Sequence, residues 1–227
     1  MALLLRRTFL IAAKDLRAEL RTKEAINASL SFSLVILLLF SFAFDPTSEE
    51  ILNFSGGLLW IVFAFAGALI LNRSFARELP NDCLDALIAS PISSSALYLG
   101  KALANVLLLL GVEIVCLCVF GIFYNINWTV QLGPLLLVLA LGTWALTIIG
   151  TMFSALTVNL RLRELMLPTL VYPMLIPPLM AAMTLTSQLL TGAPLGPENF
   201  IWIRVLVAFD IIFTLLAFFL VDFVLVG

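Results

Sequence analysis

Residues 102–123 read ALANVLLLLGVEIVCLCVFGIF, and Glu113 is the only charged side chain in this run. A helix needs about 20 apolar residues to cross the hydrocarbon core of a bilayer. Lipid offers the backbone no hydrogen-bond partners, so a spanning segment of this length must be helical. The run therefore predicts a transmembrane helix, and similar runs elsewhere decide the fold class of the whole chain.

Five further stretches are equally long and apolar: 25–44, 51–71, 132–158, 165–190 and 201–226. The composition agrees, because 63% of the 227 residues are hydrophobic and 11% are charged, whereas soluble domains have about a quarter of their residues charged. We therefore expect an all-α polytopic membrane protein, with six transmembrane helices in a single domain that covers residues 1–227.

Lysine and arginine residues lie in alternate connections between these spans. Of the 12 such residues, all except Arg204 lie before residue 25, within 72–101 or within 159–164. Connections 45–50 and 124–131 contain none. Positively charged loops remain in the cytoplasm, so this distribution predicts that both termini and the 72–101 connection are cytoplasmic.

Residues 3–24 precede the first span and are too polar to cross a bilayer. Drawn as a helix, this segment has an apolar side formed by Leu5, Phe9, Ala12, Ala13, Leu16 and Leu20, with arginines on the adjoining side. The pattern predicts an amphipathic interfacial helix that lies on the cytoplasmic leaflet, with its basic residues near anionic headgroups. A soluble cytoplasmic helix is the alternative.

The 72–101 connection is longer than a turn requires, and long connections often carry function. A short helix is expected after Pro80, and Ser93 to Ser95 can cap the next span. Asn81 or Asp82 can cap this helix, its apolar face would be formed by Leu84, Leu87 and Ile88, and Ser90 and Pro91 would end it. The helix either docks in a groove of a partner or packs on the underside of the bundle, and the residues leave both possibilities open.

The fifth span contains four prolines, which are Pro168, Pro173, Pro177 and Pro178. Each proline removes a backbone donor and clashes with the preceding turn, so we expect a kinked or broken helix. Pro168 lies in the first turn, where proline is tolerated. The other three are candidate hinge residues, with a fixed bend as the alternative.

Two carboxylates, Glu113 and Asp210, lie well inside predicted spans. An ionisable group is costly within lipid and is therefore a default marker of function. The two residues either line a shared polar pathway or accept hydrogen bonds locally from Ser, Thr or Asn side chains.

Several chemistries are excluded by missing residues. The chain contains no histidine, which removes His-dependent catalysis and His-ligated metals. No G-x-x-x-x-G-K-[ST] phosphate loop occurs, so any ATP dependence must come from another subunit. We expect no metal site and no catalytic residues, and the charges form no basic stripe for nucleic acid outside the N-terminal helix.

Ten short motifs lie in the N-terminal helix, in the 72–101 connection and in or just before the first half of the fifth span. They are Lys14-Asp15-Leu16-Arg17, Arg21-Thr22-Lys23-Glu24, Phe75-Ala76-Arg77-Glu78, Leu84-Asp85-Ala86-Leu87, Ser90-Pro91, Tyr98-Leu99-Gly100-Lys101, Arg161-Leu162-Arg163-Glu164, Leu167-Pro168, Tyr172-Pro173 and Ile176-Pro177. Together these motifs resemble the CcmB family, the permease of the cytochrome c maturation exporter.

The resemblance implies an ABC-2 type permease in a cell inner membrane. Residues 81–91 would be the coupling helix that docks on the ATPase, with Asp85 joining the residues named above. Further cytoplasmic docking contacts would come from Arg77, Glu78, Arg161, Arg163 and Glu164. For the last three residues, anchoring in the lipid headgroups is the alternative interpretation.

The partners that the resemblance implies are a second copy of the chain, a CcmA-like ATPase, CcmC-like and CcmD-like membrane proteins and a CcmE-like haem chaperone. ATP would be bound by the ATPase, and haem would be a possible cargo of the complex. Haem iron is usually held by His, Cys, Met or Tyr. Histidine is absent and no such pair is evident, so we expect that this chain binds no cofactor directly and does not ligate haem iron.

Three other functions compete with this interpretation. One is an ABC-2 permease for a drug, lipid or polysaccharide, another is a stand-alone ion-coupled transporter that uses Glu113 and Asp210, and the third is a scaffold that does not transport.

Overall fold

The computed structural model describes residues 2–44, 49–80, 83–90, 92–158, 160 and 163–226. Its helices are α1 (Ala2–Thr22), α2 (Glu24–Ala43), α3 (Glu49–Ser74), η1 (Ala76–Glu78), α4 (Cys83–Ala89), α5 (Ser94–Phe123), α6 (Leu132–Thr157), α7 (Arg163–Leu190), η3 (Pro197–Asn199) and α8 (Phe200–Val226). Six of the long helices, α2, α3, α5, α6, α7 and α8, are long and apolar enough to cross a membrane. The predicted all-α polytopic fold with six spans is confirmed.

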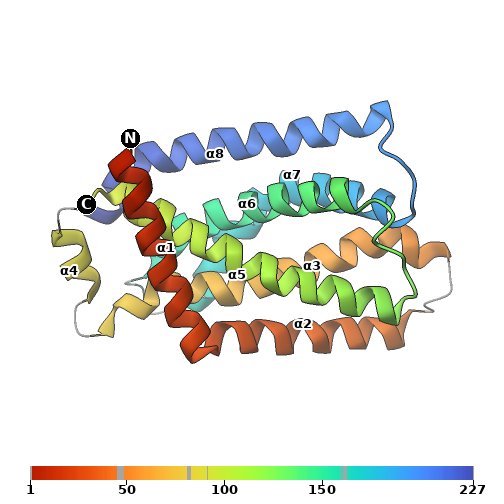
Figure 1. Ribbon diagram of the computed structural model, residues 1–227, viewed down its shortest axis with the longest axis horizontal. Coiled ribbons are helices and arrows are strands. Elements are labelled where there is room, and N and C mark those ends of the chain that lie inside the picture. Colours follow the sequence, from red (N-terminus) through yellow and green to blue (C-terminus); the bar gives the residue numbers. More distant parts are fainter. Residues whose placement is uncertain are drawn as a thin grey trace.

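The six long helices run side by side along the length of the molecule, and α1 crosses one end of the bundle (Figure 1). The short helix α4 and both chain termini lie at this same end, which we call the α4 end. The helix α1 packs mainly against the first turns of α5. The segments that carry most of the lysines and arginines therefore gather at one end of the bundle.

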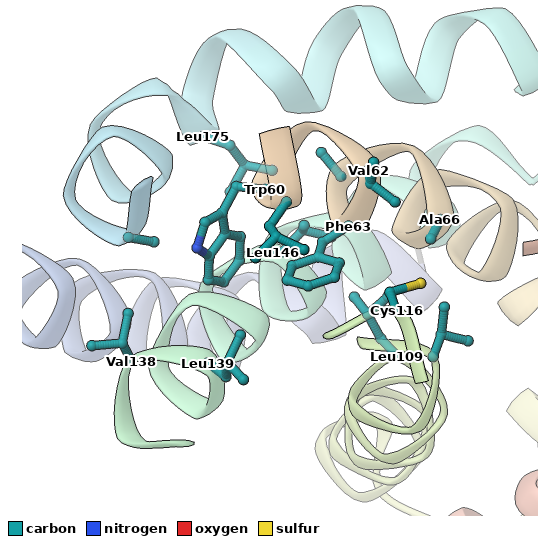
Figure 2. Packing of buried hydrophobic residues seen from close by; sticks show 14 of the residues in the cluster. Trp60, Val62, Phe63, Ala66, Leu109, Cys116, Val138, Leu139, Leu146 and Leu175 are labelled. Carbon is teal, nitrogen blue, oxygen red and sulfur yellow. The ribbon is translucent and has the colours of Figure 1, made fainter. Parts of the chain in front are cut away.

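The helix α3 forms the centre of the bundle and packs against α2, α5, α6 and α7. It supplies Trp60 and Phe63, which are two of the largest fully buried side chains. Figure 2 shows these two rings among Leu109, Leu146 and Leu175, which come from three neighbouring helices. The outer faces of α2 and α8 remain exposed and apolar, as expected for surfaces in contact with lipid.

Two glycines allow the helices around α3 to approach closely. A Cβ atom on Gly142 of α6 would lie 2.1 Å from the Trp60 ring, and one on Gly56 of α3 would lie 2.1 Å from the carbonyl oxygen of Met183 in α7. Lipid tails are as apolar as leucine, so membrane helices associate through close packing at small residues rather than through the hydrophobic effect. The absence of a side chain at these positions sets the spacing of α3, α6 and α7.

Hydrogen bonds from side chains join the same helices inside the bundle. The indole of Trp60 donates to the Thr186 hydroxyl at 2.9 Å, and Ser154 donates to the carbonyl oxygen of Leu71 at 2.7 Å. The indole of Trp144 in α6 donates to the hydroxyl of Thr214 in α8, also at 2.9 Å. Each contact gives a buried polar group a partner that lipid cannot provide.

Two predicted elements, the third span and the fifth span, differ from the structure in more than their exact end residues. The helix α5 begins at Ser94, because the Ser93 hydroxyl accepts a hydrogen bond from the amide of Ala96 and caps the helix. The predicted cap at Ser93 is therefore confirmed, but Lys101, which was assigned to the connection, is buried within α5. The helix α7 continues through all four prolines, so of the expected kinked or broken helix the break is wrong for the described residues, and the kink stays a prediction.

The contact between Gly142 and Trp60 can be tested by adding one methyl group. We predict that Gly142→Ala lowers the free energy of unfolding by about 1–3 kcal/mol, because the new methyl overlaps a ring that cannot move. Gly111→Ala is the matched control, since Gly111 is also in a helix but has open space around it. Thermal unfolding of the purified chain in detergent should separate the two variants, and equal midpoints would contradict the role of Gly142.

Candidate functional site

The short helix α4 (Cys83–Ala89) projects from the end of the bundle and makes few contacts with the other helices (Figure 1). Cys83, Ala86 and Ala89 are exposed and Leu87 is partly exposed. The Ser90 hydroxyl donates to the carbonyl oxygen of Leu87 at 2.6 Å, which closes the last turn of the helix. The described part of α4 is thus a short helix with its surface open to a partner.

Several residues that were assigned to the coupling helix cannot be placed. Asp82 and Pro91 lie outside the described residues. Leu84, Asp85 and Ile88 belong to α4, but their side chains are also outside the description. Leu87 and Ser90 therefore carry the structural account of this helix.

The ammonium group of Lys101 is the centre of a polar cluster at the α4 end. Its side chain is 1% exposed, although lysine is rarely buried unless it is paired. The Nζ atom donates to Asp15 Oδ2 at 3.1 Å, to Glu78 Oε1 at 3.2 Å and to the carbonyl oxygen of Ser74 at 2.9 Å. One buried cation thus joins α1, η1 and the end of α3 to α5.

Lys14 of α1 approaches the same two carboxylates from the more exposed side. Its Nζ lies 3.1 Å from Asp15 Oδ1 and 2.6 Å from Glu78 Oε1. Burial opposes the charged form, but the hydrogen bond to Glu78 and the two negative charges outweigh it and raise the pKa of Lys14. A raised pKa gives stabilisation that persists through neutral pH and is lost only as the pH rises above the ordinary lysine value of 10.5.

Glu19 fixes the sharp turn between α1 and α2. Its Oε1 accepts hydrogen bonds from the amides of Ala25 and Ile26 at 2.7 and 3.1 Å, which are free donors at the start of α2. Its Oε2 is ion-paired with Arg77 of η1. Lys23 makes the turn in the left-handed region with a φ of 56°. The Glu19 side chain, which is fully buried, therefore ties α1, α2 and η1 together.

Asn105 extends this cluster into the bundle. Its side-chain amide donates to the hydroxyls of Ser74 and Thr151, both at 2.9 Å. The end of α3 is therefore linked to α5 and α6 as well as to α1. A movement of η1, which leads directly into the segment that carries α4, would be passed to all of these helices.

The predicted docking residues fall into two groups. Arg77 and Glu78 are engaged in the internal cluster around Glu19 and Lys101. Arg161 lies outside the described residues, and Arg163 and Glu164 start α7 with side chains that are not described. The contacts of Arg77 and Glu78 support a structural role inside the protein.

The two carboxylates within the spans have different surroundings. Glu113 is fully buried and accepts a hydrogen bond from the Thr143 hydroxyl, which lies 2.8 and 2.7 Å from its two oxygens. Asp210 is 7% exposed, and neither of its oxygens has a hydrogen-bond partner among the described residues. A local hydrogen bond satisfies the buried carboxyl group of Glu113. No such bond among the described residues satisfies the carboxyl group of Asp210.

The candidate hinge residues lie along a continuous α7. Pro173 and Pro177 are exposed on the bundle surface, whereas Pro178 is buried. The assignment of these residues as a hinge stays a prediction.

The sequence analysis missed the role of Asp15 and Glu19. The two acidic residues are four positions apart, so they lie on the same face of α1. An acidic pair on an otherwise basic helix is the signal that would have indicated buried cationic partners, here Lys101 and Arg77.

The cluster can be tested by comparing its two lysines. We predict that Lys101→Met lowers the free energy of unfolding by about 3 kcal/mol, because it removes the buried cation and leaves the partly buried Asp15 and Glu78 with only the half-exposed Lys14 as a partner. Lys14→Met is the matched control, since it removes a lysine from the same two carboxylates at a half-exposed position and should cost at most about 1 kcal/mol. Thermal unfolding in detergent measures both, and an equal loss would show that Lys101 has no central role.

Comparisons with known proteins all match this chain to one family of membrane proteins. The sequence model of the family described as "CcmB protein" matches residues 6–225. "Heme exporter protein B" of Rhodobacter capsulatus is 32% identical over 161 residues, which are 70% of this chain and 73% of that protein. The proteins of the same name are 31% identical over 163 residues in Paracoccus denitrificans (70% and 72% of the two chains) and 28% identical over 206 residues in Pseudomonas aeruginosa (90% and 91%).

Proposed function

We propose that this chain, which belongs to the CcmB family, is the membrane-spanning permease of an ATP-driven haem exporter whose ATPase is a separate polypeptide. The relatives named "Heme exporter protein B" support haem as the cargo. The absence of a phosphate-binding loop from the sequence supports a separate ATPase. The complex would act in c-type cytochrome biogenesis in a cell inner membrane.

The observation that carries this proposal is the position of α4. A coupling helix must present a free surface to a soluble partner and must also be connected to the spans that it moves. The helix α4 stands apart from the bundle, and η1 just before it is joined by Arg77 and Glu78 to α1 and α5. Closure of the ATPase would move α4, and the cluster around Lys101 and Glu19 would pass that movement to the spans.

The complex would contain a second copy of this chain, a CcmA-like ATPase, CcmC-like and CcmD-like proteins and a CcmE-like haem chaperone. ATP hydrolysis would drive either export of haem or release of the haem-loaded chaperone. In both cases this chain would act as a non-catalytic membrane subunit, which its match to the CcmB family supports.

An ion-coupled transporter without an ATPase is the second candidate. The carboxylate of Asp210, which has no hydrogen-bond partner in the part of the chain that the structure describes, favours it, because a carboxylate within a span often carries protons. That function predicts proton-dependent transport by the isolated chain, whereas the haem exporter predicts none without its ATPase.

The orientation of α4 can be tested with a native cysteine. Cys83 begins α4 and is exposed, whereas Cys116 is buried and Cys118 lies within α5. We predict that a membrane-impermeant maleimide labels Cys83 in inverted vesicles and not in sealed cells, because positive loops face the cytoplasm. Cys83→Ser should abolish the labelling. Labelling of sealed cells would overturn both the topology and the docking of an ATPase at α4.

Docking of the ATPase can be tested at Leu87. We predict that Leu87→Asp places an unpaired charge in the contact and reduces both recovery of the ATPase and haem-stained c-type cytochromes at least about tenfold. Thr129→Asp is the control, because it adds the same charge at an exposed position in the 124–131 connection. Normal ATPase recovery and normal cytochromes in Leu87→Asp would remove α4 from the mechanism.

A further inference from the structure

A groove of about 720 Å³ runs along α3 between α2 and α7. Its floor is formed by Phe65, Ala68, Leu69, Asn72 and Arg73 of α3, with Phe32 and Glu24 on α2, Leu165, Pro168 and Tyr172 on α7, and Ala76 and Arg77 at η1. Ligand pockets in proteins typically enclose about 300–1,000 Å³ and combine apolar walls with a few polar groups. The size and the lining of this groove match that class.

The groove is polar at one end and aromatic at the other. Arg73 lies eight residues after Phe65 on α3, and Glu24 lies eight residues before Phe32 on α2, so each pair is separated by about 12 Å along its helix. Both charged ends lie at the α4 end of the bundle. The groove therefore suits an amphipathic molecule whose charged edge lies at the membrane surface and whose apolar body lies within the membrane.

The apolar part of the groove is lined by aromatic rings. The ring centroids of Phe32 and Phe65 are 5.8 Å apart, and those of Phe65 and Tyr172 are 6.0 Å apart. Phe32 and Phe65 are 40% and 44% exposed, so their faces and edges remain available for contact. Aromatic rings bind flat π-systems by stacked or edge-to-face contacts, which favours a planar occupant over a flexible acyl chain.

The polar part of the groove favours a carboxylate. Arg73 and Arg77 both line it, and guanidinium groups bind carboxylates through paired hydrogen bonds. Arg77 is already engaged by the buried Glu19, whereas Arg73 is paired with Glu24 in a surface contact in which both side chains are substantially exposed. Exposed pairs of this kind are weak, so a carboxylate of a ligand can replace Glu24 at Arg73.

The side chain of Asn72 is a further polar group in the groove. The side-chain oxygen of Asn72 is buried and has no hydrogen-bond partner among the described residues, although buried polar atoms are nearly always paired. A rotated amide group would instead present its NH₂ group, which can donate to a carboxylate next to Arg73. Asn72 lines the groove beside Arg73, so its NH₂ group is the second donor available to a carboxylate there.

We propose that this groove binds a porphyrin dicarboxylate, with its carboxylates at Arg73 and Asn72 and its flat ring against Phe32, Phe65 and Tyr172. This inference rests on the proposed function, because haem is a planar porphyrin with two carboxylates on one edge. The groove would be the place where the cargo enters the permease from the cytoplasmic leaflet.

The groove holds the porphyrin by its edge and its faces rather than by its metal. The described lining contains neither cysteine nor methionine, and the chain has no histidine. The Tyr172 hydroxyl is already used, because it donates to the carbonyl oxygen of Ala64 at 3.2 Å. A site without an axial ligand suits a cargo that must leave again.

The test is porphyrin binding by the full chain in nanodiscs of neutral phosphatidylcholine, followed by fluorescence quenching or absorbance. Metal-free protoporphyrin IX and haemin should bind with affinities within about threefold of each other, and protoporphyrin dimethyl ester should bind at least about tenfold more weakly. Tight binding of haemin with no binding of the metal-free ring would overturn the proposal in favour of axial ligation.

Two variants of the exposed ion pair should act in opposite directions. Arg73→Gln should weaken binding of metal-free protoporphyrin IX about tenfold, because it removes a charged hydrogen bond. Glu24→Gln should strengthen binding about two- to fivefold, because it removes the carboxylate that competes for Arg73. Arg204→Gln, an exposed arginine at the other end of the bundle, is the control and should change nothing. A decrease in both pair variants would show that the pair is structural.

Membrane lipid is the competing occupant. Replacing phosphatidylcholine by phosphatidylglycerol should leave porphyrin binding within about threefold, whereas a lipid site would lose porphyrin binding and retain copurified anionic lipid. The experiments also distinguish a failure of the groove proposal from a failure of the proposed function. Absence of porphyrin binding with a clear effect of Leu87→Asp on cytochromes overturns the groove alone, and porphyrin binding with no effect of Leu87→Asp overturns the coupling alone.

Discussion

The buried ammonium group of Lys101 is the constraint on which the α4 end of this protein depends. A lysine that is 1% exposed must be neutralised, and Asp15, Glu78 and the carbonyl oxygen of Ser74 do so from three different segments. This requirement holds α1 across the end of the bundle and holds η1 against α5. The cluster is therefore both an anchor for α1 and a rigid connection behind α4.

The same end of the molecule contains the groove that we assign to the cargo. Arg77 belongs to both features, because it lines the groove and pairs with Glu19 of the cluster. Glu19 in turn accepts hydrogen bonds from the first amides of α2, which forms one wall of the groove. A displacement of η1 by the ATPase would thus change the width and the charge of the groove together. In the proposed complex, this arrangement would give a physical route from ATP hydrolysis on the partner subunit to the groove.

Much of the fold could be predicted because it depends on local properties of the sequence. The run around Glu113 indicated a span by its length and apolarity, and Ser93 indicated the start of α5 by its capping hydroxyl. The site was less predictable. Lys101 was assigned to a connection because a lysine beside an apolar run is usually exposed, and its burial depends on Asp15, which lies far away in the sequence. The prolines of α7 indicated a kinked or broken helix; one continuous helix passes through all of them, which excludes the break and leaves the kink a prediction.

The sequence by itself determined that this chain spans a membrane six times and that its positive charges gather at one end. Both conclusions follow from the cost of placing charges and unpaired backbone groups in lipid, which is paid residue by residue. Only the tertiary structure decided that α3 is central, that Glu113 meets Thr143 and that Arg73 and Phe65 share a groove with Tyr172. These pairings depend on close fits such as Gly142 against Trp60. In lipid every apolar face is equally well solvated, so hydropathy cannot reveal which faces meet.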